Sequence, residues 1–290
     1  GGGGFMVMYD SETSKEYSID YREKAPALST RDMYLNDDGS FNDKYLSTFG
    51  YLSIGVPGTV AGLWEVHKQF GSLPWSALIE DAINYAENGF YMTDYMADVL
   101  YKYNEKMSYF PETKKIFQKD YPNFRNKKLF QKDLAKTLRV ISLNGRDGFY
   151  KGEVAKKITD QMQLNGGLIQ SADLENYNPV WREPIISSYR DNKIITMGPP
   201  SSGGIHIIQM LNILENYDLN ELGHNSTDYI NLLTEVMKHA YADRSKYLGD
   251  PDFFDVPIDK IISKKYSDEI FNSVALGNSV PAKDIHPGMY

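Results

Sequence analysis

The feature that most constrains the fold of this chain is the stretch from Lys193 to Asp218, where an extended segment turns abruptly into an apolar one. Residues 194–197 read Ile-Ile-Thr-Met, a β-branched apolar run that favours a strand. Pro199 and Pro200 follow. They must end that strand, because proline has no amide hydrogen to donate to a sheet and fixes its own φ.

A helix is predicted directly after this turn. We call residues Pro199–Gly204 the elbow; Ser201 or Ser202 can cap the helix, and the two following glycines let backbones approach closely. Apolar side chains then recur around almost the whole circumference of the helix, at positions 205, 207, 208, 210, 211, 213 and 214. A helix that is apolar nearly all round is predicted to be buried.

The elbow also allows a second interpretation, because the N-terminus of a helix attracts anions. Phosphate-binding loops require a lysine or a fixed glycine spacing, and the Pro-Pro-Ser-Ser-Gly-Gly-Ile-His sequence has neither. We therefore favour close packing as the purpose of the elbow, with an anion site as the alternative.

Charge and cysteine content exclude several function classes. The 290 residues include 31 basic and 39 acidic side chains, for a net charge of −8, which argues against a general nucleic-acid or membrane-surface binder. The chain has no cysteine, so disulfides, thiol catalysis and thiolate metal sites are excluded. No apolar run approaches the length of a membrane span, and no charged-then-apolar leader begins the sequence.

Two hairpins and a series of helices are predicted from local pattern. Residues 5–9 and 17–21 form one hairpin, and residues 184–190 and 193–197 form another through an Asp191-Asn192 turn. One predicted helix begins at Pro57 and is closed by Gly71, the next runs from Trp75 to Asn88, and a third begins at Thr93 or Asp94. Two further helices end at Asn144 and Asn165. A long amphipathic helix is capped by Asn225 or Ser226 and ended by Gly249. Residues 103–130 are predicted to be irregular, because Pro111 and Pro122 interrupt them.

Part of that irregular region is basic and aromatic. Residues 104–132 contain eight Lys or Arg against three Asp or Glu, with six Phe or Tyr between them. Basic and aromatic side chains together can bind single-stranded nucleic acid. A solvated, partly tucked loop is the interpretation we favour, because the chain as a whole is acidic.

Metal-binding patterns are missing from the sequence. The five histidines have no paired spacing, so we interpret them as structural. Asp250, Asp252 and Asp255 lack the central glycine and closing glutamate of a calcium-binding EF-hand, and a turn at a helix C-terminus is the simpler interpretation.

Arg22 is the one side chain that the sequence singles out for ligand binding. It follows a strand-like run, is flanked by Asp20 and Glu23, and is followed by Pro26, which fixes the path of the chain. A guanidinium placed in this way can hold a carboxylate through two parallel hydrogen bonds. Composition alone leaves an ordinary ion pair as the alternative.

Several motifs together resemble one family. The sequence is similar to the large subunit of the γ-glutamyltranspeptidases from Gly1 to Pro287, and it contains in order G-G-G-G-F-M, D-Y-R-E-K-A-P-A, G-V-P-G-T-V-A-G-L, N-G-G-L-I, P-P-S-S-G-G-I-H and Y-A-D-R-S-K-Y-L-G-D-P-D-F. The resemblance implies an α+β fold, the four-layer α-β-β-α sandwich of the N-terminal nucleophile hydrolases, built from two chains cut from one precursor. Residues 1–290 are then expected to form a single domain without an internal boundary, as a helix-rich, incomplete large subunit.

The resemblance also implies a reaction and a location. Arg22 matches the arginine that binds the α-carboxylate of the γ-glutamyl donor. The nucleophile is the threonine that begins the small subunit, with its own α-amino group as the base, so no catalytic residue is expected in this chain and the chain alone is expected to be inactive. The expected partners are the small subunit, glutathione or another γ-glutamyl donor, and an amino acid, peptide or water acceptor. No metal or organic cofactor and no nucleic acid are expected, and the implied location is periplasmic or secreted. The front of the large subunit is expected to lie before Gly1, and the processing site after Tyr290.

Two alternatives to this γ-glutamyl transfer hypothesis stay open. A relative that hydrolyses cephalosporin side chains or processes poly-γ-glutamate would share the fold, although Arg22 argues for a donor with a free α-carboxylate. A catalytically silent homologue kept for binding would share it as well.

Overall fold

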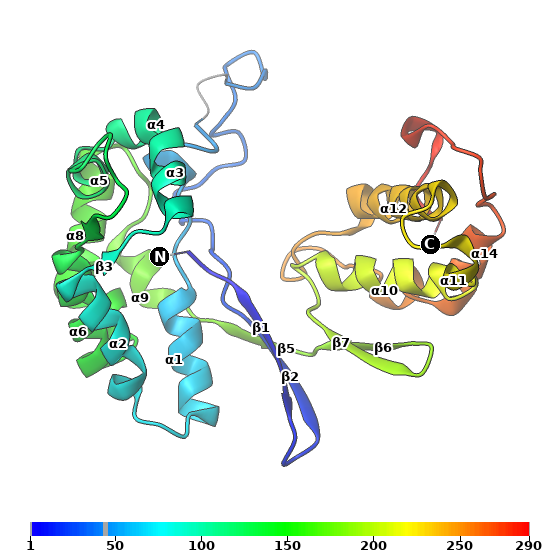
Figure 1. The fold of residues 1–290 in the computed structure, drawn as a ribbon, viewed down its shortest axis with the longest axis horizontal. Coiled ribbons are helices and arrows are strands. Elements are labelled where there is room, and N and C mark those ends of the chain that lie inside the picture. The colour runs from blue at the N-terminus through cyan, green and yellow to red at the C-terminus, as the bar shows by residue number, and fades with distance from the viewer. Residues whose placement is uncertain (1, 43–45, 290) are drawn as a thin grey trace. The chain divides into compact units, whose positions relative to one another are not determined.

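The computed structural model describes residues 2–42 and 46–289 (Figure 1). The chain is mixed α+β, and its contacts divide it into two compact units. The first unit is built from residues 1–4 and 21–179, and the second from residues 5–20 and 180–290. The expected single domain over residues 1–290 stays a prediction.

The first unit is mainly helical (Figure 1). Its elements are η1 (Tyr51–Ser53), α1 (Thr59–Phe70), α2 (Trp75–Asn88), β3 (Phe90–Tyr91), α3 (Asp94–Lys102), α4 (Asn104–Ser108), α5 (Pro111–Phe117), β4 (Lys128–Leu129), α6 (Lys132–Asn144), α7 (Asp147–Tyr150), α8 (Gly152–Leu164) and α9 (Ser171–Asn176). The main core of the unit gathers residues from its first and last thirds, which include Val56, Ala61, Ile141, Phe149, Tyr150, Met162, Leu174 and Tyr177.

Local signals predicted most helix ends in this unit. The predicted bounds of α2 are confirmed, and the hydroxyl of Thr93 caps α3 by accepting a hydrogen bond from the Met96 amide at 3.2 Å. The predicted start of α1 at Pro57 is wrong, because the helix begins at Thr59. The carbonyl of Pro57 instead accepts the hydroxyl of Tyr150 at 2.6 Å, a long-range contact that fixes Pro57 outside the helix.

The expectation that residues 103–130 are irregular is also wrong. They contain α4, α5 and β4, and β4 pairs with β3. Pro111 lies in the first turn of α5, where a missing amide hydrogen costs nothing, so it starts a helix there. A small separate core supports the region, made of Met92, Ala97, Leu100, Phe124 and Leu129.

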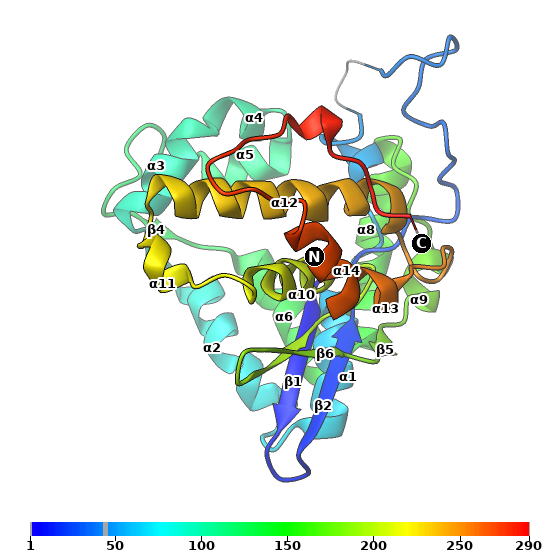
Figure 2. The ribbon, with the colours of Figure 1, turned by 90° about the vertical axis from the view of Figure 1, so that its right-hand side faces the viewer.

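The second unit combines short antiparallel sheets with helices (Figure 2). Its elements are β1 (Phe5–Asp10), β2 (Lys15–Asp20), β5 (Val180–Arg182), β6 (Ile185–Tyr189), β7 (Asn192–Thr196), α10 (Gly203–Leu214), α11 (Leu219–Leu222), α12 (Thr227–Tyr247), α13 (Ile258–Ile261), α14 (Lys264–Phe271) and η2 (Ala282–Asp284). One sheet has the order β1-β2-β5, and β6 pairs with β7. The first predicted hairpin is confirmed, with Phe5 opposite Asp20.

The second hairpin is confirmed as well, but its turn is shifted by one residue. Tyr189 pairs with Asn192, so Arg190 and Asp191 form the turn in place of Asp191 and Asn192. Arg190 has a φ of 51°, and its amide donates to the Glu215 carboxylate at 2.6 Å. This bond from α10's C-terminal end stabilises a left-handed turn residue that the sequence did not indicate.

The buried helix after the elbow is confirmed as α10. Ile205, Ile208 and Ile213 are fully buried, and α12 runs alongside α10 (Figure 2). Ser226 caps α12 by accepting from the Tyr229 amide at 3.1 Å, as predicted. Of the two serines predicted to cap α10, Ser202 occupies the cap position, but its hydroxyl accepts a hydrogen bond from Arg244 at 3.2 Å. The Ser201 hydroxyl accepts instead from the amide of Gly203, the first residue of the helix, at 3.3 Å.

The two elbow glycines differ in their surroundings. A Cβ on Gly204 would lie 2.6 Å from the Thr196 hydroxyl and closer still to the Met197 carbonyl oxygen, so the helix packs directly against the end of β7. A Cβ on Gly203 would meet only the Ser201 hydroxyl, at an ordinary 3.5 Å. Close packing is therefore confirmed for Gly204 and not for Gly203.

Candidate functional site

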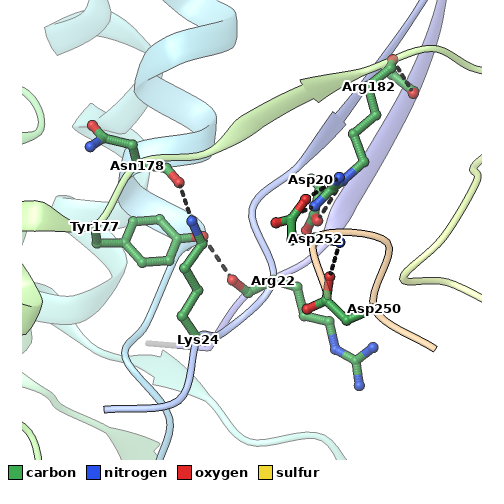
Figure 3. A network of polar contacts seen from close by, with 9 residues as sticks. Asp20, Arg22, Lys24, Tyr177, Asn178, Arg182, Asp250 and Asp252 are labelled. Carbon is green, nitrogen blue, oxygen red and sulfur yellow. Dashed lines mark hydrogen bonds and ion pairs between the residues drawn. The ribbon is translucent and has the colours of Figure 1, made fainter. Parts of the chain in front are cut away.

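Arg22, the predicted binding residue, lies in the first unit on a short connection that follows β2. We call residues 21–27 the arginine segment. The side chain of Arg22 is exposed, whereas the preceding Tyr21 is buried. In Figure 3 the Arg22 guanidinium extends away from Tyr177, which contacts the backbone of the same residue.

Backbone hydrogen bonds hold the arginine segment on two sides. Tyr21 donates to the Gly4 carbonyl at 2.9 Å and accepts from the Gly4 amide at 3.2 Å. Lys24 and Val56 exchange a second reciprocal pair, at 3.2 and 2.8 Å. The main chain on both sides of Arg22 is therefore fixed by partners that come from two other parts of the sequence.

Glycines make this close approach possible. A Cβ on Gly3 would lie 2.5 Å from the Tyr21 carbonyl oxygen and 2.7 Å from the Cα of Arg22, inside the 3.0 Å that real Cβ atoms respect. Gly58 and Gly62 are equally crowded by Tyr21. We call the set the glycine frame, made of Gly3, Gly4, Gly55, Gly58 and Gly62. It explains the glycines of the G-G-G-G and G-V-P-G-T-V-A-G motifs apart from Gly1, which lies outside the described residues, and Gly2, which is not crowded but has a φ of 80°.

A buried tyrosine completes the support. Tyr177 is 2% exposed, and its hydroxyl donates to the Arg22 carbonyl oxygen at 2.8 Å (Figure 3). Its ring stacks on Tyr150 with centroids 5.8 Å apart, and Arg146 donates to its carbonyl at 2.7 Å. The sequence analysis missed Tyr177, because nothing in its local pattern distinguishes it from any other core aromatic residue.

Tyr150 connects this support to the start of α1. It is fully buried, donates to the Pro57 carbonyl at 2.6 Å and accepts from the Ala61 amide at 3.4 Å. Burial raises the pKa of the Tyr150 hydroxyl to about 12. The hydroxyl is therefore protonated, and able to donate, throughout the neutral range.

The rest of the arginine segment is anchored by further polar contacts. Lys24 donates to the Asn178 carbonyl at 3.1 Å and lies over the Tyr177 ring, with its ammonium 5.4 Å from the centroid. The Ala27 amide donates to the Asp173 carboxylate at 2.9 Å. The segment can therefore present one exposed guanidinium on a backbone that is held along its length.

Asp20, the predicted acidic neighbour of Arg22, belongs to a cluster in the second unit. It accepts from the Arg182 guanidinium at 2.9 Å, and Arg182 also makes a bidentate pair with Asp252 at 3.0 and 3.1 Å (Figure 3). Asp250 accepts from the Asp252 amide at 3.0 Å. This cluster connects β2 and β5 to the loop after α12, and no motif of the sequence pointed to Arg182.

The part of the chain that the structure describes contains neither a metal-binding cluster nor a membrane-spanning helix. Within residues 2–42 and 46–289, no group of three or more His, Asp or Glu side chains is arranged to hold a metal ion. Among those same residues, no helix has the length and apolar character needed to cross a bilayer.

Comparison with known proteins identifies the family. The model of the gamma-glutamyltranspeptidase family matches residues 1–288. The glutathione hydrolase proenzyme of Escherichia coli K12 is 43% identical over 290 residues, covering 99% of this chain and 50% of that protein. An acylase ACY 1 proenzyme from Pseudomonas sp. strain V22 is 40% identical over 257 residues, covering 87% of this chain and 46% of that protein.

A solved structure agrees with these sequence matches. The crystal structure of Helicobacter pylori gamma-glutamyltranspeptidase matches with a TM-score of 0.96 and 44% identity, over 100% of this chain and 83% of that one. The chain spans about half the length of the curated relatives that it matches. By sequence and by structure, the chain belongs to the gamma-glutamyltranspeptidase family.

Proposed function

We propose that this chain is the large-subunit half of an enzyme that transfers or hydrolyses γ-glutamyl groups, and that Arg22 binds the α-carboxylate of the donor. The observation that most strongly favours Arg22 as the binding residue is how it is held: the glycine frame and Tyr177 fix its backbone, while its side chain is exposed. A guanidinium on a fixed backbone loses only its own side-chain freedom when it forms two parallel bonds to a carboxylate, and its planar fork is already shaped for them.

The proposed reaction is acyl transfer. The threonine that begins the second half of the precursor attacks the γ-carbonyl carbon of glutathione or a related donor, and its α-amino group takes the hydroxyl proton and passes it to the leaving amine. Water, an amino acid or a peptide amine then accepts the glutamyl group. Arg22 contributes by fixing the far end of the donor, which keeps the γ-carbonyl at a constant distance from the nucleophile.

The remaining parts of the proposal concern assembly. The small subunit would complete a four-layer α-β-β-α sandwich, to which the short sheets and helices of this chain contribute. The proenzyme names of the relatives support a precursor that is cut into two chains. A periplasmic or secreted location and the need for no metal or organic cofactor are proposed with the family reaction.

The direct test uses the complete protein with both halves and a γ-glutamyl anilide as donor. Lysine at position 22 keeps the charge but cannot form the planar pair of bonds, so Arg22→Lys should raise the Michaelis constant of the donor about tenfold, which corresponds to about 1.4 kcal/mol of binding. Arg31→Lys is the matched control, because the Arg31 side chain is 96% exposed. Equal donor constants in both variants would contradict the role of Arg22.

A second candidate is supported by the similarity to a protein called an acylase. In that case the complete protein would hydrolyse a glutaryl cephalosporin, whose acyl group keeps the terminal carboxylate but lacks the α-amino group, at least as fast as a γ-glutamyl anilide. A poly-γ-glutamate processing relative would shorten that polymer in the same assay. A processed protein that turns over none of these substrates would support a silent, binding-only homologue.

A further inference from the structure

The first unit contains a cavity of about 440 Å³ formed by α5, β4 and the start of α6. This size falls within the range of small-molecule sites in proteins. The residues that line the cavity are Met92 and members of the stretch 115–134. Most of these residues come from the basic and aromatic region that the sequence singled out and that the proposed function does not use.

The floor of the cavity is apolar and already built. Met92, Phe124 and Leu129 are buried members of the small core of this region, and Ile116 and Phe117 pack against them. An apolar group that entered the cavity would contact side chains whose positions are fixed by packing, so little ordering would be needed on binding.

The rim of the cavity is positive. Four lysines line it, at positions 115, 119, 128 and 132, against two aspartates at positions 120 and 133. Asp133 accepts a hydrogen bond from Lys136 at 2.9 Å, and Lys115 pairs with Glu112 at 3.6 Å, so three other rim lysines face Asp120. An excess of lysines around one cavity is notable in a chain whose net charge is −8, because it favours an anionic ligand at this place.

We propose that this cavity binds a small amphiphilic anion, in which a carboxylate or sulfonate is attached to an apolar body. The apolar body would lie on Phe117 and Phe130, and the anionic group would lie among the rim lysines. Such a ligand matches both the positive rim and the apolar floor of the cavity, whereas a plain phosphate ion would match only the rim and a neutral apolar molecule only the floor.

Single-stranded nucleic acid fits the same residues less well. Such binding relies on aromatic rings that are free to stack on bases. Of the three aromatic rings that line the cavity, Phe124 is only 3% exposed and Phe117 is partly buried against the small core, whereas Phe130 is 45% exposed. One largely exposed ring cannot stack a run of successive bases, but it can cover the apolar body of a single small ligand.

The test measures binding of naphthalene-2-sulfonate to the complete protein by calorimetry, with 2-naphthalenemethanol as the neutral analogue. The double variant Lys119→Gln/Lys128→Gln removes two rim charges from exposed positions. The matched control is Lys106→Gln/Lys127→Gln, which removes two exposed lysines of the same region that do not line the cavity. Turnover of the γ-glutamyl anilide reports that each variant is folded.

We expect the sulfonate to bind at one site, at least tenfold more tightly than the neutral analogue. The rim variant should weaken binding about tenfold and the control by less than twofold. The proposal is overturned if the sulfonate does not bind, if the neutral analogue binds as well, or if both variants lose affinity equally. It is also overturned if a single-stranded oligonucleotide displaces the sulfonate from the wild-type protein in a salt-sensitive way.

Discussion

The hydroxyl of Tyr177 donates a hydrogen bond to the backbone carbonyl oxygen of Arg22, 2.8 Å away and 155 residues earlier in the sequence (Figure 3). One of these residues is buried and the other is exposed. The buried tyrosine therefore fixes the main chain of Arg22 without occupying its side chain. This division of roles suits a binding arginine, because the guanidinium is exposed while the backbone that carries it is held still.

The hydrogen bond from Tyr177 predicts a specific kinetic effect. In the complete protein, Tyr177→Phe should raise the Michaelis constant of a γ-glutamyl donor about threefold and leave kcat nearly unchanged, because orientation is lost while charge is kept. The variant should also lose about 1 kcal/mol of stability. Steady-state kinetics check this against Tyr95→Phe, which alters a tyrosine that is 80% exposed. A fall in kcat at constant Michaelis constant would contradict the positioning role.

The elbow allows a paired test of close packing. Gly204→Ala places a methyl group against the end of β7, and overpacking of this kind costs about 1–3 kcal/mol. Gly203→Ala has room for the same group and should leave stability unchanged or raise it by up to about 1 kcal/mol. Thermal unfolding of the two variants measures the difference. Equal midpoints would show that Gly204 is not needed for packing, and would reopen the anion interpretation of the elbow.

The raised pKa of Tyr150 predicts how stability changes in alkali. The pKa is about 12 in the folded chain against an ordinary 10.0, so between these values the unfolded chain has lost a proton that the folded chain keeps. The free energy of unfolding should therefore fall as the pH rises through this window, by up to about 1.4 kcal/mol per pH unit from this group.

Tyr150→Phe isolates that contribution. At pH 8 the variant should be about 1–3 kcal/mol less stable than the wild type, because the Pro57 carbonyl loses its buried donor. The gap should narrow between pH 10 and pH 12, since only the wild type has this proton to lose. Urea unfolding at pH 8, 10 and 11 measures the gap, with Tyr95→Phe as the baseline. A gap that stays constant up to pH 11 would contradict the assigned pKa.

Local chemistry explains why part of the fold was predictable. The ends of α2, the cap of α12 and both hairpins depend on residues within a few positions of each other, such as Gly89 and Ser226. Two of the errors occurred where a distant contact decides. The Tyr150 hydroxyl moved the start of α1 from Pro57 to Thr59, and the Glu215 carboxylate shifted the second hairpin turn to Arg190.

The candidate site, too, could be predicted only where its signals are local in the sequence. Arg22 was found through a motif that is continuous in the sequence, and the glycine motifs were visible too. Their common purpose was not visible, because residues 2–4, residues 55–62 and Tyr177 meet around the arginine segment only in the folded chain. A single sequence has no signal for a contact that spans 155 residues.

The central claim is that Arg22 recognises the α-carboxylate of a γ-glutamyl donor. The most direct measurement compares proteins with and without the guanidinium on donors with and without that carboxylate. The complete protein and its Arg22→Ala variant are assayed with γ-glutamyl p-nitroanilide and with 4-aminobutyryl p-nitroanilide, which lacks only that carboxylate. We predict that wild type prefers the γ-glutamyl donor at least about tenfold in kcat/KM, equivalent to about 1.4 kcal/mol, and that the preference nearly disappears in Arg22→Ala. If the variant kept the full preference of the wild type, the α-carboxylate would be recognised elsewhere and the account would be wrong.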